Sequence, residues 1–345
     1  MTGVSALPTV TLPPWATDLI AAARVAGEDV ALGLEVAAKY GDRLPLPGCG
    51  ETAVRWALLA EVAAADLTGA RILEAHSDAL AILAEASGAG EYSQPVPAGT
   101  WGVFAAEGAG VRLDATDGPR GWRLTGTKPW CSLGGVLDHA LVTAHAGAQR
   151  RLFAVDLHEP SVHADPPSGW AARGLRNVPS GPVHFAATPA YPVGRPSWYL
   201  TRAGFAWGGL GVAACWYGGA HALAHSLRAA AAGREPDGLL SMHVGAADVA
   251  MHGAAASLLE AARVVDDADP RDGRAGELLA LRVRSVVVDA AERVLAHVAH
   301  ALGPAPLAFD EEHARRVADL QIYIRQHHAE RDLATLGKLL SGGGP

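Results

Sequence analysis

The chain contains fifteen histidines. An imidazole can bind a metal ion or transfer a proton near neutral pH, so these residues are the first candidates for chemistry. His221 and His225 are four residues apart, and His297 and His300 are three apart. Each pair could therefore share one face of a helix. Neither pair has a carboxylate or another histidine at a spacing that would supply a third ligand. The sequence predicts structural or solvent-facing histidines here and no metal site.

A glycine-rich run is the second candidate. Gly209-Leu-Gly-Val-Ala-Ala214 fits the G-x-G-x-x-A form of the dinucleotide-binding fingerprint. That fingerprint needs a strand that ends just before the first glycine and an acidic residue about 20 positions later. Residues 200–207 instead have the pattern of a helix or loop, and the acidic residue nearest that distance, Glu235, lies beside a proline. Close helix packing through small residues is the preferred interpretation.

Two further histidines lie on apolar helical faces. His76 shares a stripe with Ile72 and Leu80, and His327 is in register with Leu320. Both side chains are therefore predicted to point inward. Such a histidine is either a hydrogen-bonded core residue or a buried acid–base group, and the spacing leaves both interpretations open.

Composition excludes several classes of protein. The net charge is −8 and the basic residues are scattered, so no surface for nucleic acid is predicted. The three cysteines are far apart, and the start of the chain lacks a basic segment followed by an apolar run, so we expect a cytoplasmic protein. Residues 203–224 contain no Asp, Glu, Lys or Arg. Because they are mostly Gly and Ala with tryptophans inside, they predict a buried helix of a soluble bundle rather than a membrane span.

The elements that must position these residues fall into three regions. Residues 18–87 have a helical apolar period, residues 96–195 read as short strands between turns, and the helical period returns from Trp198 to Leu340. This segregation predicts an α+β fold, with a helical domain at 1–96, a β-domain at 97–196 and a helical domain at 197–345. The predicted strands are 101–104, 111–113, 121–124, 141–142 and 152–155.

The most specific motif lies in the predicted β-domain. Trp101-Gly-Val-Phe-Ala-Ala-Glu107 is followed by Gly121-Trp-Arg-Leu-Thr-Gly-Thr-Lys-Pro-Trp-Cys-Ser-Leu133. These segments resemble the acyl-CoA dehydrogenase family, in which Gly-x-Phe-Ala-x-Thr-Glu precedes a hairpin ending in Leu-x-Gly-x-Lys-x-Trp-Ile-Thr/Ser-Asn. The resemblance extends to residues 64–66 and 70–76, to 174–176 and 183–185, and to 302–303 and 316–320. The matching hairpin positions are Leu124, Gly126, Lys128, Trp130 and Ser132.

The resemblance implies a flavoenzyme, with FAD or alternatively FMN as cofactor. It implies a β-barrel-like middle domain, a C-terminal four-helix bundle and a homodimer or homotetramer. Trp130 would flank the isoalloxazine ring, Ser132 would donate a hydrogen bond near N5, and Ala105 to Glu107 would offer backbone groups to the pyrimidine edge. The cofactor-binding residues implied are Phe104, Ala105, Ala106, Glu107, Trp130, Cys131, Ser132 and Gly303.

The sequence also departs from the family pattern. The family's glutamate base follows the helix that here carries Arg316 and Asp319, and Gln326 or His327 occupies its place. The alternative base position of some members would be Thr201. The Arg-x-x-Phe-Gly motif that helps to hold the FAD pyrophosphate is missing, and Arg234 is a poor substitute.

These departures leave three functional hypotheses open. The first is a dehydrogenase acting on an acyl-CoA or related acyl substrate, with His327 or His328 as the proton acceptor. The second is a reduced-flavin-dependent monooxygenase acting on a small molecule, for which His76 and His327 become candidates. The third is a non-catalytic homologue, since fold does not fix function. The candidate catalytic residues are His76, Gln326, His327 and His328.

Overall fold

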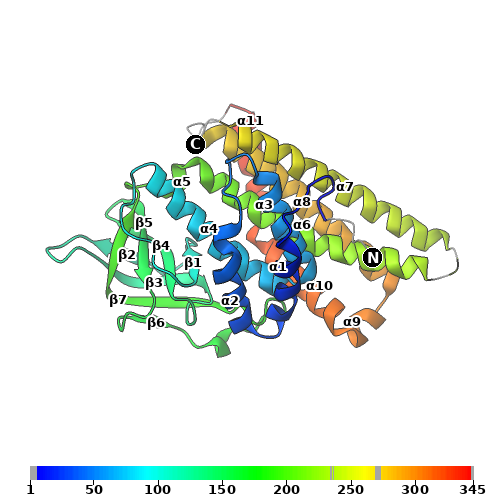
Figure 1. Cartoon of the computed structure of the whole chain (residues 1–345), viewed down its shortest axis with the longest axis horizontal. Helices are drawn as coiled ribbons and strands as arrows, with labels where there is room; N and C mark the ends of the chain where they lie inside the picture. Colours follow the sequence, from blue (N-terminus) through cyan, green and yellow to red (C-terminus); the bar gives the residue numbers. More distant parts are fainter. Residues whose placement is uncertain (1–5, 234, 236, 269–272, 343–345) are drawn as a thin grey trace.

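The computed structural model of the chain describes residues 6–233, 235, 237–268 and 273–342. Helices come first, then strands, then helices again, in the order that the sequence predicts. Figure 1 shows the strands gathered at one end of the molecule and the long C-terminal helices extending to the other. The N-terminal helices lie between these two parts, against both.

The N-terminal region consists of α-helices joined by short turns. The α3–α4 turn is sharp because the backbone of Asp66 is extended rather than helical, with φ −158° and ψ 127°. The Asp66 side chain accepts a hydrogen bond from the backbone N–H of Gly69 and so caps α4. Asp29 caps α2 in the same way. Helix α3 is buried along most of its length and packs on α6. The helices are α1 (Ala16–Ala23), α2 (Val30–Tyr40), α3 (Thr52–Ala65) and α4 (Leu67–Gly88).

Seven strands form the middle domain. Strands β4, β2, β3, β7 and β5 pair in that order, and β5 pairs again with β4, so the five form a closed cycle. Strands β1 and β6 are added to it through β4 and β7. The bounds are β1 (Trp101–Phe104), β2 (Leu113–Thr116), β3 (Trp122–Ser132), β4 (His139–Ala146), β5 (Gln149–Asp156), β6 (Val162–Ala164) and β7 (Ser180–Val193).

Only the predicted strand 101–104 has the observed bounds; the strands predicted at 141–142 and 152–155 are longer, two others also differ, and two strands were missed. The strand predicted at 111–113 begins at Leu113, because Gly110 at φ +77° keeps the preceding residues in a turn. The strand predicted to end at Leu124 continues to Ser132, through a β-bulge that accommodates Pro129. Strand β7 contains Pro182, Pro189 and Pro192, which remove the usual sequence signal, and β6 has only three residues.

The C-terminal region is built on three long helices, α6, α7 and α8, which pack on one another, while α10 packs on α6. Gly209 to Ala214 lie inside α6 with no strand before them, so this run serves helix packing. At Gly218 a Cβ atom would lie 2.1 Å from the carbonyl oxygen of Ala60, so only glycine permits this approach of α6 to α3. The helices are α5 (Trp198–Thr201), α6 (Ala203–Ala232), α7 (Gly238–Asp267), α8 (Gly273–Leu302), α9 (Ala305–Phe309), α10 (Glu311–Tyr323) and α11 (Glu330–Leu340).

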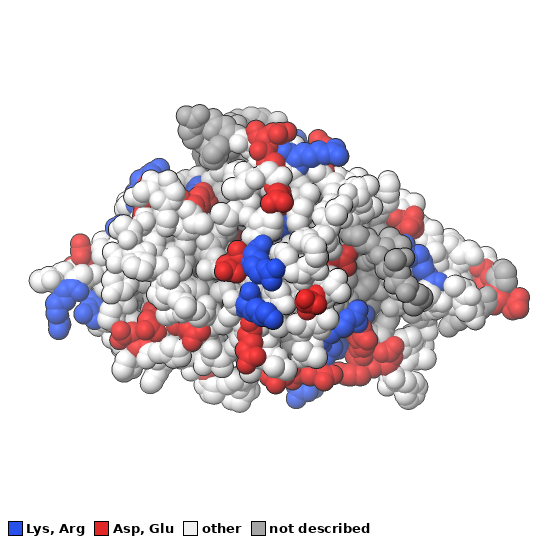
Figure 2. Space-filling view, viewed as in Figure 1, with Lys and Arg blue, Asp and Glu red and all other residues white. Residues whose placement is uncertain are grey.

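One hydrophobic core joins the N-terminal and C-terminal helices, through side chains such as Trp56, Leu59 and Leu210, and it continues into the strands at Phe104 and Phe153. Within the described residues, no helix has the length and apolar character needed to cross a membrane. On the face shown in Figure 2, basic and acidic side chains are interspersed rather than gathered into a stripe of one sign.

Candidate functional site

The bulge in β3 presents Trp130 to the outside of the strand domain. The β3–β7 register shifts between Lys128 and Cys131, and Trp130 within this shift has φ +59°. A bulky residue with positive φ is strained and is often found at a functional site. The two flanking side chains, Lys128 and Cys131, point into the core, whereas the Trp130 side chain is 61% exposed. No aromatic ring of the described residues stacks on it.

Ser132, the last residue of β3, links the bulge to helix α4. Its Oγ lies 2.7 Å from Oγ of Ser180, and Ser180 Oγ donates to the carbonyl of Val178 at 3.2 Å. The Ser132 hydroxyl hydrogen is therefore directed at Ser180, and Ser132 Oγ accepts from Nη2 of Arg71 at 3.1 Å. This chain of hydrogen bonds fixes the serine between a strand and a buried guanidinium group.

Arg71 belongs to a buried polar cluster between α4 and α10. Its Nη1 lies 2.9 Å from Oε2 of Glu74, and the Tyr323 hydroxyl donates to the same oxygen at 3.4 Å. Burial raises the pKa of Glu74, which Arg71 partly offsets, and burial also raises the pKa of Tyr323. Sequence reasoning missed all three residues. The sequence feature that could have identified them is Arg71-x-x-Glu74, a pair of opposite charges three residues apart in an otherwise apolar helix. Such a pair is usually interpreted as a surface ion pair.

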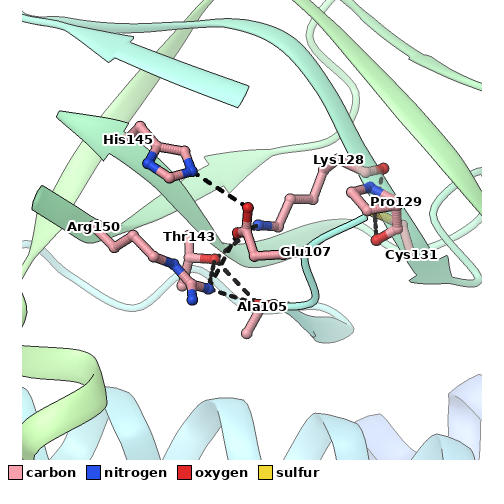
Figure 3. A network of polar contacts seen from close by, with 8 residues as sticks. All are labelled: Ala105, Glu107, Lys128, Pro129, Cys131, Thr143, His145 and Arg150. Atoms are coloured by element: carbon pink, nitrogen blue, oxygen red, sulfur yellow. Dashed lines mark hydrogen bonds and ion pairs between the residues drawn. The ribbon is translucent and has the colours of Figure 1, made fainter. Parts of the chain in front are cut away.

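A second polar network surrounds Glu107, just after β1, and is drawn in Figure 3. Lys128 Nζ donates to Oε1 of Glu107 at 2.7 Å and to Oγ1 of Thr143 at 2.9 Å. Arg150 Nη2 lies 3.2 Å from the same carboxylate oxygen and donates to the carbonyl of Ala105 at 2.8 Å. Nε2 of His145 lies 3.3 Å from Oε2 of Glu107. Three side chains thus hold one carboxylate in place.

The charges of this network depend on one another. Burial lowers the pKa of Lys128, and the contact with Glu107 offsets that effect only in part. Partial burial alone would raise the pKa of Glu107, but the hydrogen bond and charge of Lys128 hold it below its ordinary value. The carboxylate therefore offsets part of the cost of burying the charged lysine, which gives the Glu107 side chain a structural role of its own.

The predicted cofactor-binding residues differ in what they expose. Trp130, Cys131 and Ser132 share the end of β3, and Ala106 and Glu107 are exposed beyond the end of β1. Phe104 is a core residue. The Cys131 thiol is also buried and donates to the carbonyl of Lys128, and burial raises its pKa to about 12. Gly303 has φ +67° and ends helix α8.

His76 points inward, as the sequence predicts. Its Nδ1 accepts the backbone N–H of Trp101 at 3.0 Å, which joins α4 to β1. Burial lowers its pKa to about 4, so the ring is neutral at physiological pH. A Cβ atom at Gly41 would lie 2.2 Å from this ring. The surroundings are those of a packed core histidine.

The predicted base position lies in the turn between α10 and α11. His327 is buried, and its Nδ1 accepts the backbone N–H of Ala329 at 3.1 Å. Its Nε2 therefore carries the hydrogen and faces Oγ of Ser285 at 3.1 Å, whose own hydrogen goes to the carbonyl of Leu281. Burial lowers the pKa of His327. His328 and Gln326 are exposed at the surface, and His328 Nδ1 lies 3.3 Å from Asp332.

Two other segments of the resemblance meet in space. Oδ1 of Asp319 accepts the backbone N–H of Leu175 at 2.5 Å, which joins α10 to the loop before β7. At Gly174 a Cβ atom would lie 1.9 Å from the carbonyl of Ala318, so this contact requires glycine. Burial raises the pKa of Asp319 to about 6. This one contact between α10 and the loop before β7 gives a structural role to both the Gly174-Leu175 segment and the Asp319 segment.

His297 and His300 lie on the same helix, α8, and both approach a third histidine, His243. His297 Nδ1 lies 3.0 Å from Nδ1 of His243 on α7, and the His300 ring is 6.1 Å from that of His243. The described part of the chain contains no group of three or more His, Cys, Asp or Glu side chains arranged to hold a metal ion.

No protein-family model and no curated protein sequence matches this chain. Solved structures do. TdsC from Paenibacillus sp. A11-2, a dibenzothiophene monooxygenase crystallised with FMN and indole, aligns with a TM-score of 0.77 and 18% identity over 94% of this chain and 95% of that one. A nitrososynthase from Micromonospora carbonacea var. africana gives 0.79 and 17%, over 97% and 99% of the two chains. Butyryl-CoA dehydrogenase from Megasphaera elsdenii gives 0.72 and 17%, over 96% and 99%.

These alignments span nearly the whole of each chain, whereas the identities are too low to carry a reaction or a substrate across. The N-terminal helices, the strand domain and the C-terminal helices are all included in the aligned part of the chain. The chain therefore shares the fold of TdsC, the nitrososynthase and butyryl-CoA dehydrogenase, which is the fold that the resemblance ending at Ser132 implies.

Proposed function

We propose that this chain is a flavin-dependent monooxygenase that binds reduced flavin, with FMN favoured over FAD, and oxidises a small molecule. The observation that carries the proposal is the hydrogen bonding of His327, the residue at the predicted base position. The similarity to TdsC, crystallised with FMN, supports the same choice.

The bulge of β3 fits a planar ring with a polar edge. Trp130 is held outward by a strained backbone and offers an exposed aromatic face. Ser132, two residues later, presents a hydroxyl oxygen bonded to Arg71. An aromatic wall beside a fixed polar group is what an isoalloxazine ring requires, because its faces are apolar and its N5 and pyrimidine edges are polar.

A bound flavin would supply electron transfer and, once reduced, the activation of molecular oxygen. The chain's own residues would hold it and shield it. Trp130 would cover one face and exclude water, and the Ser132 hydroxyl, held by Arg71, would place a fixed polar group at one edge. The exposed backbone of Ala106 and Glu107 is available to the other edge, and Lys128 fixes Glu107 there.

A dehydrogenase needs a base to remove a proton alpha to the thioester, and His327 is poorly suited to this. The Nδ1 lone pair accepts from Ala329, and Nε2 carries the hydrogen that faces Ser285. No lone pair remains for a substrate proton, and the lowered pKa disfavours protonation further. At the alternative position, the Thr201 hydroxyl donates to the Ser197 carbonyl. A monooxygenase that starts from reduced flavin does not require this base.

The preference for FMN follows from the missing pyrophosphate motif. FAD carries a pyrophosphate and an adenosine that need their own contacts, and the sequence lacks the Arg-x-x-Phe-Gly segment that supplies them in the resembling family. Arg234, the nearest substitute, lies outside the described residues. FMN ends at a single phosphate and makes no such demand.

The experiment that separates the two enzymatic hypotheses is an anaerobic titration of the flavin-loaded protein with butyryl-CoA, followed by absorbance near 450 nm. A monooxygenase leaves the oxidised flavin band unchanged, and the same protein reduced with dithionite then consumes oxygen faster when its substrate is present. Bleaching by butyryl-CoA would contradict the proposal and favour the dehydrogenase. A protein that binds neither FMN nor FAD, oxidised or reduced, would favour the non-catalytic homologue.

A further inference from the structure

The hydroxyl hydrogen of Ser132 has a fixed direction, set by the last pair of the β3–β7 ladder, in which Ser132 faces Ser180. The two Oγ atoms lie 2.7 Å apart, so one hydrogen lies between them. Ser180 Oγ also lies 3.2 Å from the carbonyl oxygen of Val178, which can only accept. Because the single hydroxyl hydrogen of Ser180 goes to that carbonyl, the hydrogen between the two serines comes from Ser132.

The guanidinium group of Arg71 occupies a second bonding position of Ser132. Arg71 Nη2 lies 3.1 Å from Ser132 Oγ, and a guanidinium group can donate a hydrogen bond but cannot accept one. A hydroxyl group has one hydrogen and two lone pairs. With its hydrogen directed at Ser180 and one lone pair bonded to Arg71, Ser132 Oγ keeps one free lone pair and no free hydrogen.

This arrangement is the reverse of the role that the sequence resemblance implies, in which Ser132 donates a hydrogen bond near flavin N5. Oxidised flavin has a lone pair at N5, whereas reduced flavin has an N–H group there. An oxygen that offers only a lone pair can accept from the reduced N5–H, but it faces the lone pair of oxidised N5 without a hydrogen between them. Ser132 is partly exposed at the end of β3, so a ligand beside Trp130 can reach it.

Reversing the hydrogen bonds would leave the carbonyl of Val178 without a donor. If Ser180 gave its hydrogen to Ser132, the Ser132 hydroxyl could donate to oxidised N5, but the bond from Ser180 to Val178 would be lost. Val178 is 1% exposed, so water does not replace the missing donor. The loss of one net hydrogen bond changes an equilibrium constant roughly three- to tenfold.

We propose that Ser180 is a positioning residue that makes Ser132 a hydrogen-bond acceptor, so that the site selects reduced flavin through its N5–H group. Ser180 acts through Ser132, whose remaining lone pair is the group that meets the cofactor. The inference rests on the proposed function, and it identifies the residues that give the site a preference for reduced flavin.

An FMN analogue tests the direction of the hydrogen bond in the unchanged protein. In oxidised 5-deaza-FMN a C–H group replaces N5, so the lone pair at that position is absent. We expect fluorescence titration to show that oxidised 5-deaza-FMN binds at least as tightly as oxidised FMN, because an accepting oxygen gains nothing from the N5 lone pair. Weaker binding of the analogue would show that Ser132 donates to N5, and this result overturns the proposal.

Ser180→Ala frees the hydrogen of Ser132 to reach oxidised N5. We expect oxidised FMN to bind about fivefold more tightly and reduced FMN to bind as before, so the preference for reduced FMN falls about fivefold. Ser180→Thr keeps the hydroxyl group and should keep the preference. Ser161→Ala is the matched control, because the Ser161 Oγ is buried in the same domain and has no hydrogen-bond partner in the described part of the chain. Anaerobic ultrafiltration measures both dissociation constants.

Ser132→Ala removes the proposed acceptor itself. Reduced FMN should bind about fivefold more weakly, and oxidised FMN should bind no more weakly than before, since it receives no hydrogen from Ser132. A greater loss of affinity for oxidised FMN than for reduced FMN contradicts the proposal. So does a preference for reduced FMN that stays unchanged in both Ser180→Ala and Ser132→Ala.

These outcomes are distinct from failure of the proposed function. Unchanged preference in the variants overturns the role of Ser180 and leaves the monooxygenase standing, because other contacts can select reduced flavin. Bleaching by butyryl-CoA contradicts the monooxygenase, yet the analogue and the variants still measure the direction of the Ser132 hydrogen bond. A protein that binds no flavin in either redox state overturns both.

Discussion

At the scale of single residues, the site divides into side chains that a sequence motif can identify and side chains that only packing reveals. Trp130 and Ser132 were identified from the motif. Both lie at the C-terminal end of β3, where Trp130 has positive φ. Arg71, Glu74 and Tyr323 were missed because the last is 249 positions from Glu74 and the three meet only in the folded chain. Spacing along a sequence predicts neighbours within one element and not contacts between elements.

Trp130→Ala tests the proposed cofactor face. We expect FMN to bind about tenfold more weakly, because ring stacking is lost, while the unfolding temperature changes little for so exposed a side chain. Tyr191→Ala is the control, since Tyr191 is a similarly exposed aromatic residue of the same domain, at 58%. Fluorescence titration with FMN and thermal unfolding measure both effects. Unchanged FMN affinity in Trp130→Ala contradicts the placement of the flavin.

Glu107→Gln tests whether the carboxylate compensates the buried lysine. Its loss leaves Lys128 without an anionic partner, although Thr143 still accepts from it, so we expect a decrease of about 1–3 kcal/mol in the free energy of unfolding. Lys128→Met should cost less, because Glu107 is partly exposed and keeps Arg150 as a partner. Urea unfolding of both variants gives the comparison. A larger cost for Lys128→Met would show that lysine packing, and not charge compensation, dominates.

At the scale of elements, the sequence predicts the order and type of most helices and strands, because apolar periodicity is a local property. Strand β7 escaped prediction since its prolines break the alternation, and β3 was cut short because Pro129 and Trp130 read as a turn. The side-chain contacts that connect one element to another could not be predicted from the sequence either. His76 binds α4 to β1, and Asp319 binds α10 to the loop before β7.

These two joints respond to acid in opposite directions. The folded-state pKa of His76 is lowered from 6.5 to about 4, so its contribution to stability is present above pH 6.5 and is lost as the pH falls towards 4. The folded-state pKa of Asp319 is raised from 3.8 to about 6, so its contribution is present below pH 3.8 and is lost as the pH rises towards 6.

Urea unfolding at a series of pH values separates the two effects. Between pH 6.5 and 4, His76→Asn should lose less stability than the unchanged protein, and Asp319→Asn should lose more. Both asparagines can still accept the backbone N–H, so the comparison isolates ionisation. Parallel pH profiles for all three proteins would rule out these groups as the source of the pH dependence.

At the scale of the whole molecule, the continuous core explains why one fold holds the strand domain and two sets of helices together. Figure 1 shows α7 on the outside of the long helices. Its outer face carries exposed apolar side chains, among them Leu239, Met242 and Val249. We propose that this face contributes to the homo-oligomer that the sequence resemblance implies, with these apolar side chains covered by a second copy of the chain.

Val249→Glu places a charge in the middle of that face, where the valine is 67% exposed. We expect a lower molar mass by light scattering at unchanged unfolding temperature in dilute solution. Glu260→Ala, on the same helix and without an added charge, is the control. An unchanged molar mass in Val249→Glu, or a monomeric unchanged protein, contradicts the use of α7 as an interface.

The central claim is that the protein uses reduced flavin as a monooxygenase rather than oxidising an acyl-CoA as a dehydrogenase. It is tested most directly by the affinity of the protein for flavin in each redox state. Anaerobic ultrafiltration with oxidised FMN, dithionite-reduced FMN and oxidised FAD gives the three dissociation constants. We predict that reduced FMN binds at least about tenfold more tightly than either oxidised flavin, a difference of about 1.4 kcal/mol. Tighter binding of oxidised FAD than of reduced FMN would contradict the account.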